Sequence, residues 1–405
     1  MFERMMNMVD PRFLHHAINV ATIFHNMLKA EGRLKIQSRK ELVILAFFHD
    51  IGACTPGQDC RPSELDTGDV WKHSILSYLF LQQYFPKNDL VKVTLYHHLR
   101  YDQKIDEDPE ILWYAQLLHL ADCISIWRDV QHHSKQEISD KIKAGSGSDF
   151  SPEAISLLCK SNLMYHTWQC LSMPRILKRI IADIGITSQE AERYLYLMAN
   201  VIDFRSHNTA MHTRSVMEIS LEMARLAGFS QKIQRKIYLG ALLHDLGKIG
   251  IPIEILEKPG KLTPDEMQIM RLHVPLGESI IKGCVSDEVM QIALRHHEKP
   301  NGQGYPKGLS GSELTPPQRL LAVADVVSAL CMVRSYKEAF PKSRCLSILR
   351  EMADSNQLDK EMVKLVEDHF DRILSAAVQR CGPTQMQYIK MQQQYQKLLA
   401  KLSSI

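Results

Sequence analysis

The sequence predicts an almost entirely α-helical protein. Apolar residues recur at the three- and four-residue spacing of one helix face along most of the chain, as in the series Val216, Ile219, Met223 and Leu226. Alternating runs typical of strands are hard to find. The chain has 405 residues, more than a single hydrophobic core normally serves, so two domains are expected.

The first domain is expected to cover residues 1–150. Its end is marked by a small polar stretch at 143–149, which suits an exposed loop. Ser151 and Pro152 then fit the cap and the first position of a new helix. Residues 151–187 are therefore predicted to be connecting helices.

The second domain is expected over residues 188–405. Its later part carries a helical series of apolar residues between Val363 and Ala377, and residues 384–403 are rich in Gln, Met, Lys and Leu. This last segment predicts a closing amphipathic helix. It and the connecting helices are candidates for a homodimer contact, or they simply close the domains.

The composition is that of an ordinary globular protein. Hydrophobic residues make up 45% and charged residues 23%, and the formal charge is only +3, so no strong electrostatic field for nucleic acid is implied. The nine cysteines are scattered without a C-x-x-C pair, which fits reduced thiols. Residues 1–9 carry charges, and apolar stretches such as 43–48 are too short to cross a bilayer. We therefore expect a cytoplasmic protein that binds neither nucleic acid nor membrane.

The second half contains seven histidine and aspartate residues of the kind that bind metals. Imidazole and carboxylate groups suit first-row transition metals, and seven of them exceed the needs of one ion. Two divalent ions bridged by Asp245 are therefore predicted. A histidine such as His212, taken alone, is more often a hydrogen-bonded core residue, but buried imidazoles and carboxylates in such a number are hard to explain as packing. The set is His212, His244, Asp245, His273, His296, His297 and Asp325.

Residues near this set suit the hydrolysis of a phosphodiester, which requires activated water, neutralised phosphate oxygens and help for the leaving alkoxide. Lys248, three residues after Asp245, could face the scissile phosphate, or it could be a cation at a helix C-terminus. The loop at 301–306 contains Gly304 and Tyr305. Its glycines permit close backbone approach and positive φ, and its aromatic ring could shape a lip, although a plain turn is the alternative.

Three segments resemble the HD-GYP subfamily of the HD metal-dependent phosphohydrolases. They are LHDLGKI at 243–249, HHEKPNGQGYP at 296–306 and AVADVVSAL at 322–330, and they occur in the family's order. The resemblance implies a helical domain whose metal centre hydrolyses bacterial cyclic dinucleotides, with a hydroxide between the ions as nucleophile. It implies one ion held by His212, His244, Asp245 and Asp325, and another held by Asp245, His273, His296 and His297.

The same resemblance assigns two further cations and limits the number of metals. Arg334 and Lys337 match residues that hold substrate phosphates in related proteins, although each could also be a solvated surface charge. Asn301 stands where an aspartate is common. Asn208 lies four residues before His212, where members with a third metal carry a glutamate. The prediction is a binuclear centre of iron, manganese, nickel or a similar metal.

The first half repeats the order of ligands. The distance from His16 to His49 is 33 residues, against 32 from His212 to His244 in the second half. This repetition predicts a second HD-like domain that arose by duplication. Its set is His16, His49, Asp50, His73, His97, His98 and Asp122.

The HD-like domain of the first half lacks the residues expected to bind a substrate. Ala53 stands in place of the lysine, Gln131 and Ser134 occupy the offsets of the two later cations, and no Gly-Tyr-Pro follows His97 and His98. We therefore predict a degenerate HD domain with little or no hydrolase activity, which serves regulation, folding or dimerisation.

Three functions remain in competition. The leading one is a cyclic-dinucleotide phosphodiesterase, because a degenerate HD domain ahead of an HD-GYP domain resembles bacterial enzymes that act on 3′3′-cGAMP; cyclic di-GMP is the second substrate candidate. The others are a cyclic-dinucleotide receptor that does not hydrolyse, and a nucleotidase of the HD type. The complete ligand set with Lys248 argues against the receptor, and a nucleotidase would not need the lip formed by Tyr305.

Overall fold

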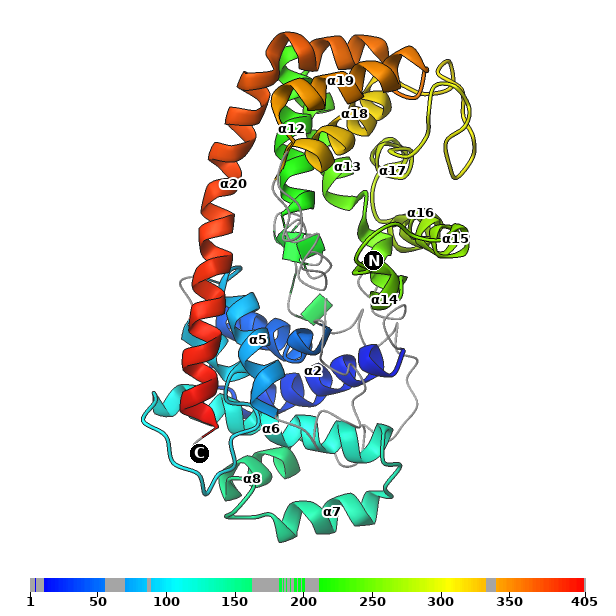
Figure 1. Ribbon diagram of the computed structural model, residues 1–405. Helices are drawn as coiled ribbons and strands as arrows, with labels where there is room; N and C mark the ends of the chain where they lie inside the picture. Colours follow the sequence, from blue (N-terminus) through cyan, green and yellow to red (C-terminus); the bar gives the residue numbers. More distant parts are fainter. Residues whose placement is uncertain are drawn as a thin grey trace. The chain divides into compact units, whose positions relative to one another are not determined.

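In the computed structural model, helices joined by turns and loops are the regular elements of the part of the chain that it describes (Figure 1). Within those residues there is no strand, only two isolated bridges, Ser146 with Phe150 and Asn301 with Ser310. The all-α prediction is confirmed. None of the described helices has the length and apolar character needed to cross a membrane. The described residues are 4, 11–54, 70–85, 89–161, single positions between 182 and 200, 211–332 and 340–403.

Two compact units divide the chain. The N-terminal unit contains residues 9–194 and 391–405, and the C-terminal unit contains residues 1–8 and 195–390. The N-terminal unit therefore includes the whole segment 151–187 that was predicted as connecting helices. The domain limits 1–150, 151–187 and 188–405 stay a prediction.

The N-terminal unit is built around α2, which packs against α3 and α6, while α5 packs against η1. Polar caps fix several helix starts. Ser134 and Glu137 form a capping box at α7, and the Ser151 side chain accepts from the Ala154 N–H at the start of α8, as predicted. The elements are α2 (Pro11–Glu31), α3 (Ile36–Phe47), η1 (Ile51–Cys54), α5 (Val70–Gln82), η2 (Asp89–Thr94), α6 (Pro109–Asp129), α7 (Lys135–Ala144) and α8 (Pro152–Lys160).

The C-terminal unit repeats this arrangement around α12, which packs against α13 and α18, while α16 packs against η3 (Figure 1). The predicted core face of α12 is present, because Val216, Ile219 and Met223 are fully buried. The elements are α12 (His212–Leu226), α13 (Gln231–Leu243), η3 (Leu246–Gly250), α14 (Ile253–Leu256), α15 (Pro264–Arg271), α16 (His273–Ile281), α17 (Asp287–Leu294), α18 (Pro316–Cys331) and α19 (Lys342–Asp354).

The last helix, α20 (Lys360–Leu402), is longer than the sequence pattern suggested. The predicted closing segment at 384–403 is its final part, and the apolar series that begins at Val363 is its buried first part. The backbone at His369 departs from helical geometry, with φ −127° and ψ 22°. Both apolar series therefore belong to one continuous helix with a kink.

Candidate active site

The C-terminal unit brings its seven predicted ligands together from separate elements. One group contains His212, His244 and Asp245 and a second contains His273, His296 and His297, with the ligand atoms of each group within 4.8 Å of one another. Asp325, inside α18, joins the first group, since its Oδ1 lies 3.0 Å from His212 Nε2. We call these seven residues the C-terminal centre.

Asp245 lies between the two groups. Its Oδ2 is 3.1 Å from His244 Nε2 and 3.6 Å from His212 Nε2. Its Oδ1 is 3.7 Å from His273 Nε2 and 4.0 Å from His296 Nε2. One carboxylate oxygen therefore faces each group, which is the geometry a bridging ligand needs.

The backbone around Asp245 explains this position. His244 still has helical dihedrals at the end of α13, but Asp245 leaves the helix with φ −101° and ψ 7°, so the pair lies at a helix end and not within a regular helix. At Gly247 a Cβ atom would lie 1.9 Å from the His273 carbonyl oxygen and 2.5 Å from Gly277 N. Only glycine lets η3 rest directly on the backbone of α16, which carries His273.

Hydrogen bonds fix the orientation of the imidazole rings. The Nδ1 atoms of His244, His273 and His296 lie 2.6–2.7 Å from the backbone carbonyl oxygen three residues earlier in the chain. A carbonyl only accepts, so each Nδ1 carries a proton and each Nε2 is the ring nitrogen that faces the centre and is available to a metal. Such support by a backbone carbonyl is typical of metal-binding histidines.

The electrostatics also favour a bound cation. His244 Nε2 and Asp245 Oδ1 are buried without a hydrogen-bond partner, which is costly unless a cation contacts them. Burial lowers the pKa of His273 to about 4 and of His297 to about 3, so both are neutral lone-pair donors at neutral pH. Burial would also lower the pKa of His244, but the Asp245 carboxylate outweighs it and raises the pKa to about 9. Without a metal, a proton on His244 offsets part of the negative charge.

Lys248 contacts a ligand of the centre. Its Nζ lies 2.5 Å from Asp245 Oδ2. The sequence left two alternatives for this ammonium, a position facing the substrate phosphate or a cation at a helix C-terminus. In the structure it contacts the Asp245 carboxylate, and its role toward a substrate stays a prediction. Burial would raise the pKa of Asp245, but His244 and Lys248 hold it well below its usual value.

Tyr305 forms one wall of the centre. Its ring stacks on His297 at a centroid distance of 4.6 Å, and its backbone N–H donates to the His297 carbonyl. The Arg271 guanidinium lies over the Tyr305 ring at 4.9 Å. Arg271 was not among the predicted site residues. The sequence feature that could have indicated it is its position two residues before the predicted ligand His273.

The two glycines of the loop serve different purposes. Gly302 has the predicted positive φ, at 76°. Gly304 makes the predicted close approach, but a Cβ there would lie 2.4 Å from Lys299 N and 2.5 Å from Glu298 Cα. The close approach thus involves the chain's own backbone, and a direct contact of Gly304 with substrate stays a prediction.

Two polar residues hold this loop in place. The Glu298 side chain is buried and accepts hydrogen bonds from the backbone N–H groups of Lys307 and Leu309. The Asn301 Oδ1 accepts from the Gln303 N–H, so the residue that replaces the common aspartate acts in the turn. Glu298 belongs to the recognised motif, but its supporting role follows only from the structure.

Three residues named in the sequence predictions lie outside the described residues. Arg334 and Lys337 follow the end of α18 at Cys331, within 333–339, and Asn208 lies within 201–210. Their roles stay predictions.

Family comparison accounts for both halves of the chain. Family profiles described as HD domain match residues 13–127 and residues 196–362. The chain contains two HD domains. Each holds one set of seven predicted ligands, and the tandem arrangement predicted from the sequence is confirmed.

Relatives of the tandem protein are cyclic-dinucleotide enzymes. The chain is 26% identical over 343 residues to 3′3′-cGAMP-specific phosphodiesterase 1 of Vibrio cholerae, covering 80% of this chain and 79% of that one. It is 37% identical over 175 residues to the cyclic di-GMP phosphodiesterase response regulator RpfG of Xanthomonas campestris, covering 42% of this chain and 46% of that one. A crystal structure of a cyclic GMP-AMP specific phosphodiesterase from V. cholerae shares the fold, with a TM-score of 0.52, 18% identity and coverage of 91% and 97%.

A pair of equivalent serines supports the first histidine of each HD domain. Ser328 Oγ lies 3.2 Å from His212 Nδ1, and Ser125 Oγ lies 3.0 Å from His16 Nδ1. Both serines are fully buried and lie three residues after the aspartate of their helix. This repeated Asp-x-x-Ser pattern was visible in the sequence, and comparing the two halves position by position would have found it.

Proposed function

We propose that the chain hydrolyses a cyclic dinucleotide, with 3′3′-cGAMP as first candidate, to the linear dinucleotide at the C-terminal centre. The observation that carries the proposal is a bridging carboxylate between two histidine groups in a centre that is partly open. The Asp325 side chain is 14% exposed and the Lys248 side chain 16%, while the rings of His244 and His296 are fully buried. An accessible edge on a buried ligand set is what a catalytic metal site requires.

The ligand set fits two divalent transition-metal ions. The oriented Nε2 lone pairs and the unpartnered Asp245 Oδ1 are the groups such ions would satisfy. When bound, the ions would lower the pKa of water and neutralise the phosphate oxygens. In the proposed assignment one ion is held by His212, His244, Asp245 and Asp325, and the other by Asp245, His273, His296 and His297.

The chain's own residues would supply the remaining needs of the reaction. Lys248, whose Nζ lies 2.5 Å from Asp245 Oδ2, would donate a proton or a hydrogen bond to the leaving alkoxide after its side chain moves away from Asp245. The backbone carbonyls that hold the histidine rings keep them oriented before substrate binds, so little reorganisation accompanies the reaction. Arg271 and Tyr305 form the rim that a nucleotide would contact, and Arg334 and Lys337 would bind the phosphates.

The ranking of the two substrate candidates depends on how much of this chain matches each related enzyme. The match to the 3′3′-cGAMP-specific enzyme covers 80% of this chain and therefore reaches into both HD domains, whereas the match to the cyclic di-GMP enzyme is limited to about two fifths of the chain. We therefore place 3′3′-cGAMP first and cyclic di-GMP second. A homodimer and a cytoplasmic location stay predictions.

Product analysis tests this proposal. The purified chain, loaded with Mn²⁺ or Fe²⁺ without oxygen, is incubated with 3′3′-cGAMP, cyclic di-GMP, cyclic di-AMP and mononucleotides, and products are resolved by mass spectrometry. We expect a linear dinucleotide from the first substrate and none after His296→Gln. Binding without any linear product, under either metal, would favour the receptor and overturn the enzyme.

A further inference from the structure

The N-terminal HD domain holds a second ligand set that the proposed reaction does not use. Its ligand atoms form two groups, each within 4.8 Å, and Asp50 belongs to both. The corresponding groups of the C-terminal centre share no residue at that distance. We call the N-terminal centre the set His16, His49, Asp50, His73, His97, His98 and Asp122.

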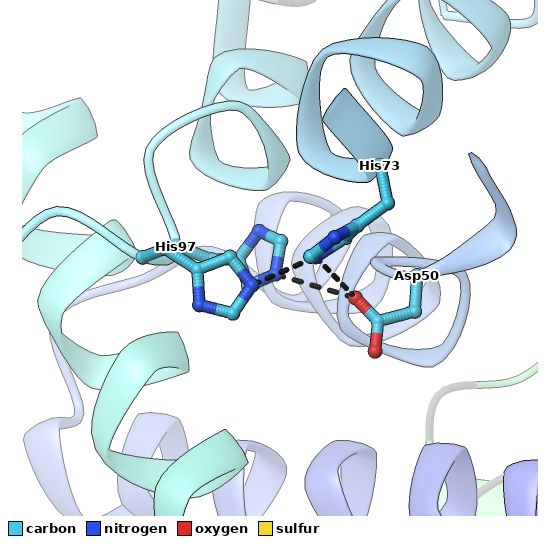
Figure 2. Close-up of side chains that lie close together, drawn as sticks. Asp50, His73 and His97 are labelled. Atoms are coloured by element: carbon cyan, nitrogen blue, oxygen red, sulfur yellow. Dashed lines mark hydrogen bonds and ion pairs between the residues drawn. The ribbon is translucent and has the colours of Figure 1, made fainter. Parts of the chain in front are cut away.

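Asp50 again offers one oxygen to each group. Figure 2 shows His73 and His97 directed at it, with Nε2 atoms 3.5 Å and 3.3 Å from Asp50 Oδ1. Its other oxygen, Oδ2, lies 3.2 Å from His49 Nε2 and 3.5 Å from His16 Nε2. Four imidazole nitrogens thus converge on a single carboxylate.

The same hydrogen-bond pattern orients these rings. His49 Nδ1 lies 2.8 Å from the Ala46 carbonyl oxygen and His97 Nδ1 lies 2.7 Å from the Thr94 carbonyl oxygen, so both Nδ1 atoms carry the proton. Their Nε2 atoms then face a carboxylate oxygen at 3.2–3.3 Å. Two unprotonated acceptors at this distance repel each other unless a metal ion or a proton lies between them.

The N-terminal centre has more unsatisfied atoms than the C-terminal one. Five buried atoms lack a hydrogen-bond partner, although some face each other at ion-pair distance, as His16 Nε2 does at 3.0 Å from Asp122 Oδ1. Such atoms are costly to bury unless a metal ion or a proton lies between them. Ala53, fully buried, takes the position of Lys248, so no ammonium from that position neutralises the carboxylates. The five atoms are Nε2 of His16, His49 and His97, and Oδ1 of Asp50 and Asp122.

The N-terminal centre is the more buried of the two, since six of its seven ligands are buried and His98 keeps intermediate exposure, as His297 does in the C-terminal centre. The Asp122 side chain is 2% exposed, against 14% for its counterpart Asp325. Beside the centre, the ring of His119 lies 6.5 Å from that of His98, and Phe150 covers His119 at 5.3 Å. Closed ligand sets are typical of structural metal sites, whereas catalytic ones keep an open position.

We propose that the N-terminal HD domain binds a pair of divalent transition-metal ions, bridged by Asp50, as a permanent structural centre that does not meet substrate. The ions replace the missing ammonium and satisfy the unpartnered atoms. Because such ions bind the folded domain and not the unfolded chain, they stabilise it. The competing arrangement is protonation of His16 and His49 with no metal bound.

Metal counting on the full chain tests the proposal through matched double variants. His244→Gln with His296→Gln removes one ligand from each histidine group of the C-terminal centre, and His49→Gln with His97→Gln does the same in the N-terminal centre. Each protein is loaded with Co²⁺ or Mn²⁺, passed through a desalting column and measured by elemental mass spectrometry. We expect the C-terminal double variant to be inactive but to keep about half of the wild-type metal, because one centre of the pair is intact.

The N-terminal double variant should lose the other half of the metal and keep its phosphodiesterase activity within a few-fold. If this variant does not fold, the C-terminal variant still decides the question, since its N-terminal centre is intact. Treating the C-terminal variant with a chelator should lower its Tm, and Mn²⁺ should restore it.

A folded C-terminal variant that retains no metal would overturn the proposal, as would a Tm that the chelator does not change. The metal count of that inactive variant is independent of catalysis. It therefore separates a failure of this proposal from a failure of the proposed phosphodiesterase activity.

Discussion

Replacing Gly247 by alanine should disable the C-terminal centre without touching any ligand. The added Cβ would lie 1.9 Å from the His273 carbonyl oxygen, and real contacts of this kind do not fall below 3.0 Å. η3 and α16 must therefore separate by about 1.1 Å, the difference between these distances. Both contacting groups are backbone, so no side-chain rotation can relieve the clash.

The separation changes the metal geometry directly, because α16 begins with His273 and η3 follows Asp245. A misplacement of about 1 Å in a catalytic arrangement costs on the order of 100-fold in rate. Overpacking of this kind destabilises a protein by about 1–3 kcal/mol. We expect Gly247→Ala to lower kcat/KM about 100-fold, to lower the Tm and to weaken metal binding.

Gly277→Ala is the matched control. It makes the same chemical change on the other side of this contact, inside α16, where a Cβ would lie 3.6 Å from Gly247 N and from the Leu294 side chain, which are ordinary van der Waals distances. It should leave activity unchanged and stability equal or slightly higher. Activity is measured on 3′3′-cGAMP, with thermal unfolding and elemental analysis on the same samples. If the two variants behave alike in kcat/KM and Tm, the contact between η3 and α16 does not position the centre.

Three further outcomes are expected. Lys248→Met should lower kcat about 100-fold with the bound metal retained, as for a lost general acid; a loss of metal in its place would mean that the ammonium serves only Asp245. Ser328→Ala frees the His212 ring and should weaken metal affinity about 10–100-fold in a chelator competition, with activity restored by excess metal; unchanged affinity would contradict this support. Lys40 Nζ lies 2.6 Å from Glu190 Oε2 and, against the effect of burial, helps to lower the pKa of Glu190 to about 2. That stabilisation is complete above the carboxyl's ordinary pKa of about 4.5 and disappears as the pH falls toward 2, so Lys40→Met should lower the Tm at pH 7 and have little effect near pH 2; an equal effect at both pH values would refute the ion-pair explanation.

The ligand inventory and the helical class could be predicted from the sequence because both depend on residue identity and order. His244 and Asp245, with the later histidine pair, specify a metal-binding chemistry wherever they fold together. The duplication was visible in the ligand spacing, and the start of α8 in Ser151 and Pro152. The Asp-x-x-Ser repeat that ends in Ser125 and Ser328 was equally readable.

The neighbours of the small and charged residues could not be predicted. Gly304 approaches its own backbone, and Lys248 contacts Asp245. A sequence permits several partners for a flexible ammonium or for a glycine, and the choice depends on how the helices pack.

The difference between the two centres depends on both the sequence and the tertiary structure. The sequence by itself determined that the halves share seven ligands and that Ala53 replaces the lysine in the first. Only the tertiary structure decided that Asp122 is sealed while Asp325 is partly exposed, and that Asp50 and Asp245 each face two groups of histidines. Those groups come from helices far apart in the chain, and their distances and burial arise from helix packing, which local sequence patterns do not encode.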